Sequence, residues 1–588
     1  MIIFVSSIHL FAQQDTTYFN SLTLALKTPG KVYKLALHGR NLSADDLEQM
    51  YKFVNLEELD VYNAGLWHFN EVVLIPHLKK LHISNSDLRD LPANLGNLKS
   101  LELLDLSHNV SIKELPASIS QLTNLKTLRI SRMDSLKEIP AFIGDLTSLT
   151  ELELEINQYC QVPVSIGNLK NLIKLELRGE DNYSIPAEIG NLTKLESLKV
   201  FNRGKALMLP ARIGGLSSLK TLTFGGIIGT LPPQFGDLLN LRFLKIEGQI
   251  RTLPAEISKL SNLEELGIAN SGEPFVFPAS IGKLSGLKIL KLESNISPEV
   301  PLEFGDLNIE YLELHYTTLS TLPAAFCKLK KLKTLQLTRN EEFNGFSINM
   351  SRLEALETLN IAAHPKTDFA TLGYFVNCKN LRTINIAESS VKELPENFDQ
   401  FSITHLGLYY VLMSEKINWS KIIKTVSKLK PLTYLGLSGS FSNLETLPAA
   451  LSSLQKIDTL SLSNNYTSVS DLKILSTIAI QRLDLSNCNL TKIPSNINLL
   501  KNISEIDLSL NELQSIDPVI TQLDHLEKLD LHKQDRFHSD SDDFYTLTDI
   551  SALSQMKNLQ QLNLSANPKI EAQISVLKEQ LKNCTLVY

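Results

Sequence analysis

Residues 115–130 read LPASISQLTNLKTLRI and contain both halves of a motif that recurs along most of the chain. The half LxxLxL alternates apolar and variable residues, which predicts a short β-strand with one buried face. The half LPxxIxxL opens with proline at a position that needs no backbone donor, which favours a short helical or 3-10 turn. In many copies glycine follows the isoleucine, as in IPAEIGNL (185–192), and we expect it to let the backbone turn back toward the next strand.

The strand segment repeats at a nearly constant spacing. About 22 copies run from Leu56 to Leu559, mostly 22 to 25 residues apart, and VYKLAL (32–37) is a further first strand. Connections of this length are too long for hairpins, so the strands stack in parallel, one in each repeat. Each repeat then buries its core only against its neighbours, and the wider turn side makes the strand face concave.

The pattern LxxLxLxxN followed by LPxxIGxL resembles that of the leucine-rich-repeat superfamily, in particular the surface repeat proteins of bacteria related to Bacteroides and Flavobacterium. The resemblance covers roughly residues 32–588. It implies an α/β solenoid, a right-handed horseshoe with a concave parallel β-sheet and short helical or 3-10 turns on the convex side. It is nearly silent on the ligand, because the superfamily binds many different partners.

The ends of the chain differ from the repeats. Residues 1–12 form a short apolar stretch that ends at Ala12 before polar residues, and we expect a signal peptide there. The positive charges that usually precede the apolar part of a signal peptide are missing. The alternatives are a chain start upstream of Met1, or an apolar strand or helix that caps the first repeat. We expect an N-terminal cap and first strand over 15–55, repeats over 56–567 and a C-terminal cap over 568–588.

Composition excludes several classes of function. The chain has 57 Lys and Arg against 64 Asp and Glu, a net charge of -7, with both signs interspersed. A nucleic-acid partner would require a basic face, so we expect none. No run of 18 apolar residues occurs, so we expect no membrane-spanning helix. The five cysteines are far apart without a CxxC pair, and at least four take positions that the repeat explains, which argues against disulfides or a zinc site.

Motifs of enzymes are also missing. The sequence has no GxSxG, HExxH, GxxxxGK[ST] or GxGxxG in a suitable context. The histidines expected on the sheet face lie on distant repeats, so we predict no metal site, no cofactor and no catalytic residue. Bacterial ubiquitin ligases with similar repeats need an additional domain with a nucleophilic cysteine, and we therefore expect this chain not to be an enzyme.

Candidate binding residues occupy the outward positions of the strands. Exposed aromatic side chains give large contact area at low entropic cost, so we predict that they bind ligand. These residues are Phe201, Phe243, Tyr311, His315, His405, Tyr409 and Tyr434. The alternative candidate is a cation site at a column of carboxylates, formed by Asp484, Asp507 and Asp530. These residues also fit LDLS, the common local form of the repeat, without any role in binding. The charges around Glu151, Glu153 and Glu176 are read as a solvated face.

Three further features interrupt the repeat. A turn asparagine commonly follows the strand and bonds neighbouring backbone. Central repeats have Met133, Glu180, Ile227 or Thr317 instead, so we expect a less regular edge there. The insertion at 409–431 predicts a convex helix over 417–430. The insertion at 532–558 is acidic and predicts an exposed loop, either a binding element or a tolerated insertion without a role.

These observations predict a non-catalytic binding scaffold that is secreted, periplasmic or on the outer-membrane surface. Its partner is a protein or a glycan, recognised on the concave face. The alternative is a cytosolic scaffold for protein–protein interaction, because LPxxIGxL also resembles repeats of intracellular Ras-pathway and plant immune proteins. The sequence does not determine the oligomeric state.

Overall fold

The computed structural model describes residues 18–39, 42–66, 68–157, 160–179, 184–228, 230–297, 299–347, 350–411, 417–535 and 546–588. The chain divides into two units: unit 1, Met1–Leu287, and unit 2, Lys288–Tyr588. The signal peptide predicted at 1–12 lies outside the described residues.

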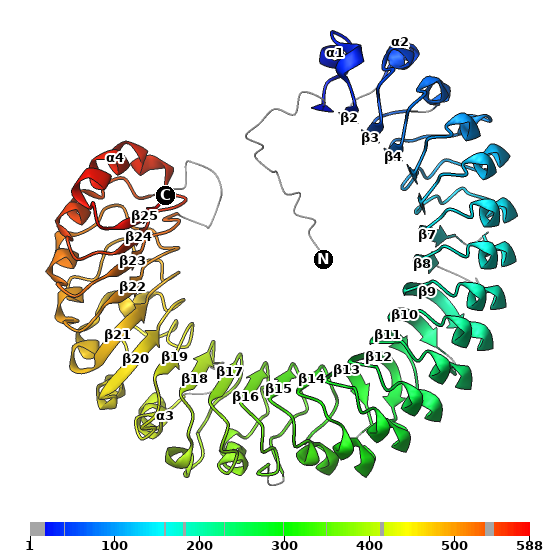
Figure 1. Ribbon diagram of the computed structural model, residues 1–588. Helices are drawn as coiled ribbons and strands as arrows, with labels where there is room; N and C mark the ends of the chain where they lie inside the picture. Colours follow the sequence, from blue (N-terminus) through cyan, green and yellow to red (C-terminus); the bar gives the residue numbers. More distant parts are fainter. Residues whose placement is uncertain are drawn as a thin grey trace. The chain divides into compact units, whose positions relative to one another are not determined.

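Unit 1 is built from parallel strands that pair with their neighbours in chain order. The strands are β1 (Tyr18–Phe19), β2 (Lys34–His38), β3 (Glu58–Tyr62), β4 (Lys80–Ser84), β5 (Leu103–Asp105), β6 (Thr127–Ile130), β7 (Glu151–Ile156), β8 (Lys174–Gly179), β9 (Ser197–Leu207), β10 (Thr221–Ile228), β11 (Phe243–Gln249) and β12 (Glu265–Phe275). Helices α1 (Leu22–Ala25) and α2 (Ala44–Glu48) precede the regular repeats. Short 3-10 helices, from η1 (Pro29–Lys31) to η12 (Ala279–Lys283), lie opposite the strands (Figure 1).

Glycine in the LPxxIG segment has a different role from the predicted one. Gly190 lies in the 3-10 helix η8 (Ala187–Asn191), and its backbone is not left-handed. A Cβ atom at Gly190 would lie 2.1 Å from the carbonyl oxygen of Arg212 in the next repeat. The expectation that this glycine turns the backbone is therefore wrong: its missing side chain lets successive turns stack closely.

The less regular edge expected in the central repeats is present beside Ile227, where the pairing of β9 with β10 shifts register between Gly225 and Ile227, whereas Glu180 lies outside the described residues. Strand β6 ends at Ile130, before Met133, but in later repeats without the turn asparagine the strands continue, and β9 and β12 reach 11 residues each. Ile227, at the place of the asparagine, pairs with Gln249 of the neighbouring strand. Gly226 and Gly248 pair beside them with φ of 123° and 144°, values that favour glycine. Extra strand pairing thus replaces the asparagine turn.

Unit 2 repeats the same architecture. Its strands are β13 (Ile289–Ile296), β14 (Tyr311–His315), β15 (Thr334–Thr338), β16 (Thr358–Ala362), β17 (Thr383–Ala387), β18 (His405–Tyr409), β19 (Tyr434–Gly436), β20 (Lys456–Ser461), β21 (Ala479–Asp484), β22 (Glu505–Asp507), β23 (Lys528–Asp530), β24 (Gln561–Asn563) and β25 (Thr585–Val587). They too pair in parallel and in chain order. Its 3-10 helices run from η13 (Leu302–Asp306) to η24 (Pro568–Ile570).

Two longer helices belong to unit 2. Helix α3 (Trp419–Val426) lies within the range where a helix was predicted, and it buries Trp419, Ile422, Ile423 and Val426. Helix α4 (Glu571–Gln580) and strand β25 lie within the segment expected to cap the C-terminus. Of the insertion at 532–558, residues 536–545 lie outside the described residues. No helix in the described ranges is long and apolar enough to cross a membrane.

Asparagines behind the strands of unit 2 form a hydrogen-bonded ladder. Asn511 is fully buried, and its Oδ1 accepts bonds from the backbone of Cys488 and Leu490 at 2.9 and 3.0 Å. Its Nδ2 donates to the carbonyl oxygens of Leu485 and Leu508 at 3.0 and 2.9 Å. One side chain therefore satisfies backbone groups of two repeats, which fixes the spacing of the strands.

Leucine, isoleucine and valine from the inward positions fill the core. The five cysteines, all among the described residues, form no disulfide. Four of them, Cys160, Cys327, Cys378 and Cys488, are buried, and Cys584 is partly exposed. Burial raises the pKa of the Cys160 and Cys327 thiols to about 11. These four side chains act as small apolar groups of the core.

Candidate functional site

The aromatic residues predicted on β18 and β19 lie together on the sheet face of unit 2. Residues Gly407 and Gly436 pair with each other at outward positions of these strands. A Cβ atom at Gly407 would lie 2.2 Å from Cε2 of Tyr409, and one at Gly436 would lie 2.4 Å from Cε1 of the same ring. The Tyr409 ring therefore lies across both strands, in the space that the two glycines leave free.

Two neighbours hold the Tyr409 ring in this position. Its hydroxyl donates a hydrogen bond to the Tyr434 hydroxyl at 3.3 Å. The Tyr434 ring stacks on the imidazole of His405, with centroids 5.7 Å apart and planes at 19°. Burial, together with the contact to Tyr434, raises the pKa of Tyr409 well above its usual value. We call His405, Tyr409 and Tyr434 the aromatic cluster; Tyr409 and Tyr434 are half-buried, and His405 is exposed.

A row of amide side chains adjoins the aromatic cluster. Gln336, Asn360 and Asn385 occupy matching central positions on β15, β16 and β17. Asn385 Nδ2 donates to Asn360 Oδ1 at 2.9 Å. Asn385 Oδ1 would lie 2.6 Å from a Cβ atom at Gly407, so it borders the place that the Tyr409 ring fills. The amide row and the aromatic cluster thus form one continuous surface.

The outward positions of β15 to β19 share a further property. All of them lie among the described residues, and none is Asp, Glu, Lys or Arg. They are Thr334, Gln336, Thr338, Thr358, Asn360, Ala362, Thr383, Asn385, Ala387, His405, Gly407, Tyr409, Tyr434 and Gly436. We call these residues the neutral face.

The two predicted residues of β14 lie beside the neutral face. The Tyr311 hydroxyl is 3.1 Å from both Glu313 Oε2 and Gln336 Oε1, so it links β14 to the amide row. The imidazole of His315 packs on the Tyr316 ring at 4.4 Å between centroids and faces Glu293 at 3.9 Å. Tyr311 therefore borders the same surface, whereas His315 belongs to a separate contact.

Phe201 and Phe243 belong to unit 1, and the structure does not bring them together. The Phe201 ring lies against Gly225 and under the Arg178 guanidinium, 5.6 Å from the ring centroid. Phe243 is 41% exposed on β11, where it pairs with Thr221 of β10. Phe201 of β9 instead pairs with Gly225 of β10, which lies two outward positions further along β10 than Thr221.

Phe201 lines a hollow of about 810 Å³ on unit 1. Arg132, Arg178, Glu155 and Glu247 contribute charges of both signs to this hollow, and Gly225, Gly226 and Gly248 contribute bare backbone to its wall. The lining is predominantly polar. This mixture does not select one class of ligand.

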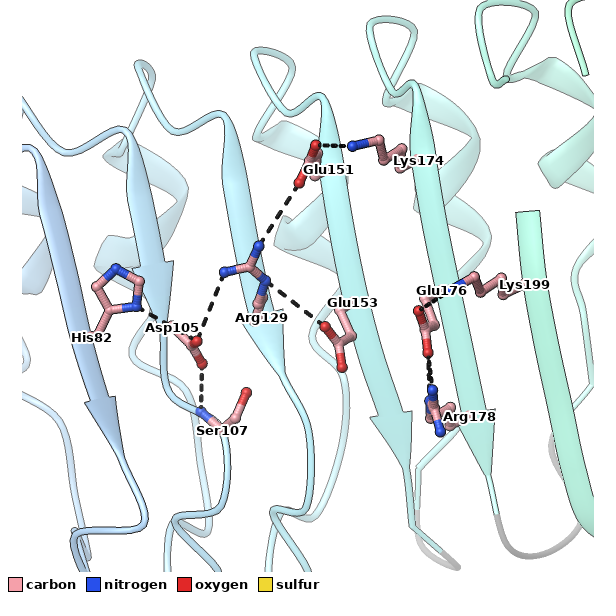
Figure 2. A network of polar contacts seen from close by, with 10 residues as sticks. All are labelled: His82, Asp105, Ser107, Arg129, Glu151, Glu153, Lys174, Glu176, Arg178 and Lys199. Atoms are coloured by element: carbon pink, nitrogen blue, oxygen red, sulfur yellow. Dashed lines mark hydrogen bonds and ion pairs between the residues drawn. The ribbon is translucent and has the colours of Figure 1, made fainter. Parts of the chain in front are cut away.

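A network of ion pairs crosses β4 to β9 on the sheet face of unit 1 (Figure 2). Arg129 lies at its centre, with carboxylate oxygens of Asp105, Glu151 and Glu153 at 3.8 to 3.9 Å. Lys174 pairs with Glu151 at 2.6 Å. The opposite charges balance within the network, so much of its attraction is already satisfied inside the protein.

Two carboxylates of this network titrate differently. Burial raises the pKa of Glu153, and the charge of Glu176 raises it further. Burial also acts to raise the pKa of Asp105, but hydrogen bonds from His82 and Ser107 outweigh it, and the net pKa is lowered. Asp105 is thus held as a carboxylate by its local bonds.

The column of Asp484, Asp507 and Asp530 has a structural role in each turn. Their Oδ1 atoms accept bonds from the backbone two residues further on, at 2.8 to 2.9 Å. Burial raises the pKa of Asp507, and the two neighbouring carboxylates add to the effect. Within the described ranges, no group of three His, Cys, Asp or Glu residues could hold a metal ion.

The sequence interpretation missed the glycines and amides that surround the aromatic cluster. The signal is present in HLGLY (405–409) and YLGL (434–437), where glycine takes an outward position in successive repeats. It also missed the link from Asp105 to Arg129, because these residues are 24 positions apart and lack a motif.

Comparisons with known proteins agree with the repeat. A family model described as a leucine-rich repeat region matches residues 43–160. Adenylate cyclase of Schizosaccharomyces pombe is 26% identical over 253 residues, which is 41% of this chain and 13% of that enzyme. The chain therefore spans only a small part of the length of this curated relative.

Solved structures with leucine-rich repeats are also similar. A leucine-rich-repeat protein of Leptospira interrogans is 25% identical, with 73% of this chain and 93% of that chain covered and a TM-score of 0.40. The plant peptide hormone receptor RGFR1, in complex with RGF2, is 20% identical, with 95% and 89% covered and a TM-score of 0.45. The LxxLxL segments and the parallel strands of each unit agree with the leucine-rich-repeat model that matches residues 43–160, and the fold of each unit is that of a leucine-rich-repeat solenoid.

Proposed function

We propose that this chain is a non-catalytic binding scaffold and that the aromatic cluster of unit 2 is the centre of its ligand site. The observation that carries the proposal is the Tyr409 ring, which lies across two glycines and is bonded to Tyr434. An aromatic ring that is already fixed loses little entropy when a ligand packs on it, so more of the contact energy appears as affinity.

The aromatic cluster is not needed to fill the core. Inward residues Leu406, Leu408 and Leu435 are fully buried and form the packing of β18 and β19. The cluster lies on the opposite side of the same strands, where the side chains keep contact with solvent. Aromatic side chains in this setting are typical anchors of binding surfaces.

Two further parts of the proposal concern catalysis and location. The matched relative is a cyclase, but the match covers 13% of it, so we do not extend its activity to this chain.

The apolar residues 1–12 support export as a signal peptide. Cell fractionation with N-terminal sequencing tests this. A mature chain that begins near Gln13 outside the cytosol supports export, and an intact Met1 in the cytosol supports the intracellular alternative.

The ligand site is tested with the substitution Tyr434→Ala. The probes are an array of oligosaccharides and an array of extracellular proteins, screened with the full chain. We expect every genuine signal to weaken at least about tenfold, as for other central aromatic anchors. The matched control is Tyr374→Ala, which removes a tyrosine that is 43% exposed in the 3-10 helix η15 (Phe369–Phe375).

Both variants must keep the melting temperature of the parent chain. If Tyr434→Ala leaves all signals unchanged, or if Tyr374→Ala reduces them equally, the aromatic cluster is not the binding site. The substitution Tyr434→Phe separates the ring from its hydroxyl. We expect a smaller loss than with alanine, because the stacking on His405 persists.

A further inference from the structure

The neutral face is unusual among the outward surfaces of unit 2. Charges occur at outward positions on both sides of it: Lys291 and Glu293 on β13 and Glu313 on β14 before it, and Asp484 on β21 after it, beyond the uncharged Thr459 and Ser461 of β20. The five strands β15 to β19 carry none, although charged residues make up 21% of the chain. A charged ligand would lose hydration on this surface without gaining an opposite charge, which is unfavourable.

The neutral face is also not apolar. Thr334, Thr358 and Thr383 form one row of hydroxyl groups in register across β15 to β17. The amide row runs parallel to it, one outward position further along the same strands. Arginine and methionine, which are common at the centre of protein–protein interfaces, are absent from the outward positions of these five described strands.

The aromatic cluster gives this polar surface an apolar end. The Tyr409 ring rests on Gly407 and Gly436 and stays partly exposed. Asn385 borders it directly, so a ligand on the ring meets amide donors and acceptors on the adjacent strand. Sugars have the matching chemistry, because a pyranose has an apolar C–H face and hydroxyl groups around its rim.

We propose that the neutral face binds a neutral, hydroxyl-rich oligosaccharide, with a sugar ring against Tyr409 and hydroxyl groups bonded to the amide and threonine rows. This inference rests on the proposed function and names its class of ligand. The five strands span about 19 Å at the usual strand spacing. A chain of several sugar units fits this length, whereas a monosaccharide covers only one end.

The test uses purified full-length chain and neutral oligosaccharides of increasing length, namely unsubstituted glucan, mannan and xylan fragments. Binding is measured by isothermal titration calorimetry. The substitution Thr383→Asp places one carboxylate in the centre of the neutral face. Its matched control, Thr221→Asp, places a carboxylate at an outward, partly exposed position of β10 in unit 1.

We expect at least one of these neutral series to bind, with affinity that rises with chain length. Thr383→Asp should weaken this binding more than tenfold, and Thr221→Asp should change it less than twofold. If Thr383→Asp lowers the melting temperature, Thr358→Asp on β16 repeats the test at the same row.

Two results overturn the inference. In the first, no neutral oligosaccharide binds. In the second, a neutral oligosaccharide binds, but a carboxylate on the neutral face leaves its affinity unchanged. The outcome for the proposed function is separate. If Tyr434→Ala abolishes binding of a protein or an acidic glycan while no neutral oligosaccharide binds, the aromatic cluster is a ligand site and only the neutral glycan is refuted. If Tyr434→Ala affects nothing, both proposals fail.

Discussion

His364 should make the stability of unit 2 sensitive to mildly acidic pH. His364 follows β16 at the position that Asn340 takes after β15. Its backbone N–H donates to Ser389 Oγ at 3.0 Å, just as the backbone N–H of Thr317 donates to Asn340 Oδ1. The imidazole is fully buried and packs edge-on against Phe343 at 5.5 Å. Neither ring nitrogen has a well-placed hydrogen-bond partner among the described groups.

Burial lowers the pKa of His364 to about 4 from 6.5, and the Leu337 carbonyl offsets this only in part. The folded chain therefore binds this proton less well than the unfolded chain. The full stability is present above pH 6.5 and is lost as the pH falls toward 4. From these two pKa values, the loss is about 2 kcal/mol at pH 5 and about 3 kcal/mol at pH 4.

The matched variant is His364→Asn, which restores the usual ladder residue and removes the titrating group. Urea unfolding of both proteins, followed by circular dichroism, is compared at about pH 7.5 and about pH 5. The variant can be less stable at both pH values, because asparagine leaves space beside Phe343. Only the change between them is diagnostic, and it should be about 2 kcal/mol larger in the parent chain. Equal changes in the two proteins would refute the reasoning.

Three further predictions follow from buried contacts. Asn511→Ala should lower the free energy of unfolding by about 2 to 4 kcal/mol in urea titrations, because it leaves buried backbone groups without hydrogen bonds. The control Asn498→Ala, at a partly exposed site, should lower it by less than about 0.5 kcal/mol. Gly407→Ala should cost about 1 to 3 kcal/mol and weaken ligand binding, because it displaces the Tyr409 ring; unchanged binding would show that the position of the ring is irrelevant. Iodoacetamide should modify only Cys584 rapidly in the folded chain, as read by mass spectrometry of peptides, and rapid modification of the other thiols would contradict their burial.

Most of the fold could be predicted because its cause is local. The segment LKTLQL (332–337) predicts a strand with alternate residues buried, and β15 (Thr334–Thr338) buries Leu335 and Leu337 while its outward residues stay partly exposed. The same leucine positions recur in nearly every repeat, so one interpretation serves the whole chain. The parallel pairing then follows from the length of the connections.

The length of the central strands could not be predicted in this way. The turn after a strand depends on a side chain that reaches the backbone of the preceding repeat, and asparagine is not the only residue that does this. Gln534 bonds Leu508 O at 2.7 Å, and Ser440 bonds Leu408 O at 2.7 Å. Where no such residue is present, glycine with positive φ allows the strand to continue, as at Gly226. The end of a strand thus depends on which residue follows it and on the backbone of the preceding repeat, and the strand motif alone does not determine it.

Part of the candidate site was predictable, because His405, Tyr409 and Tyr434 are aromatic residues at outward positions of successive strands. The direction of the Tyr409 ring was not, since it depends on glycines in two different repeats. Phe201 was selected by the same rule, yet it packs against Arg178 and Gly225 within a different surface. An aromatic residue at an outward position therefore does not define a site by itself, and the neighbouring strands decide whether such residues lie on one surface.

The alternation of the strands separates folding from recognition in this chain. Leu152 and Leu175 in unit 1 are as buried as Leu335 and Leu359 in unit 2, so the core treats these strands alike. Their outward partners differ completely, with ion pairs around Arg129 on the first pair and threonine and amide rows on the second. Because outward positions carry little of the packing energy, their chemistry is free to vary from strand to strand. A stretch of consecutive strands with one consistent outward chemistry is then more informative about the ligand than any single exposed aromatic residue, and β15 to β19 form such a stretch.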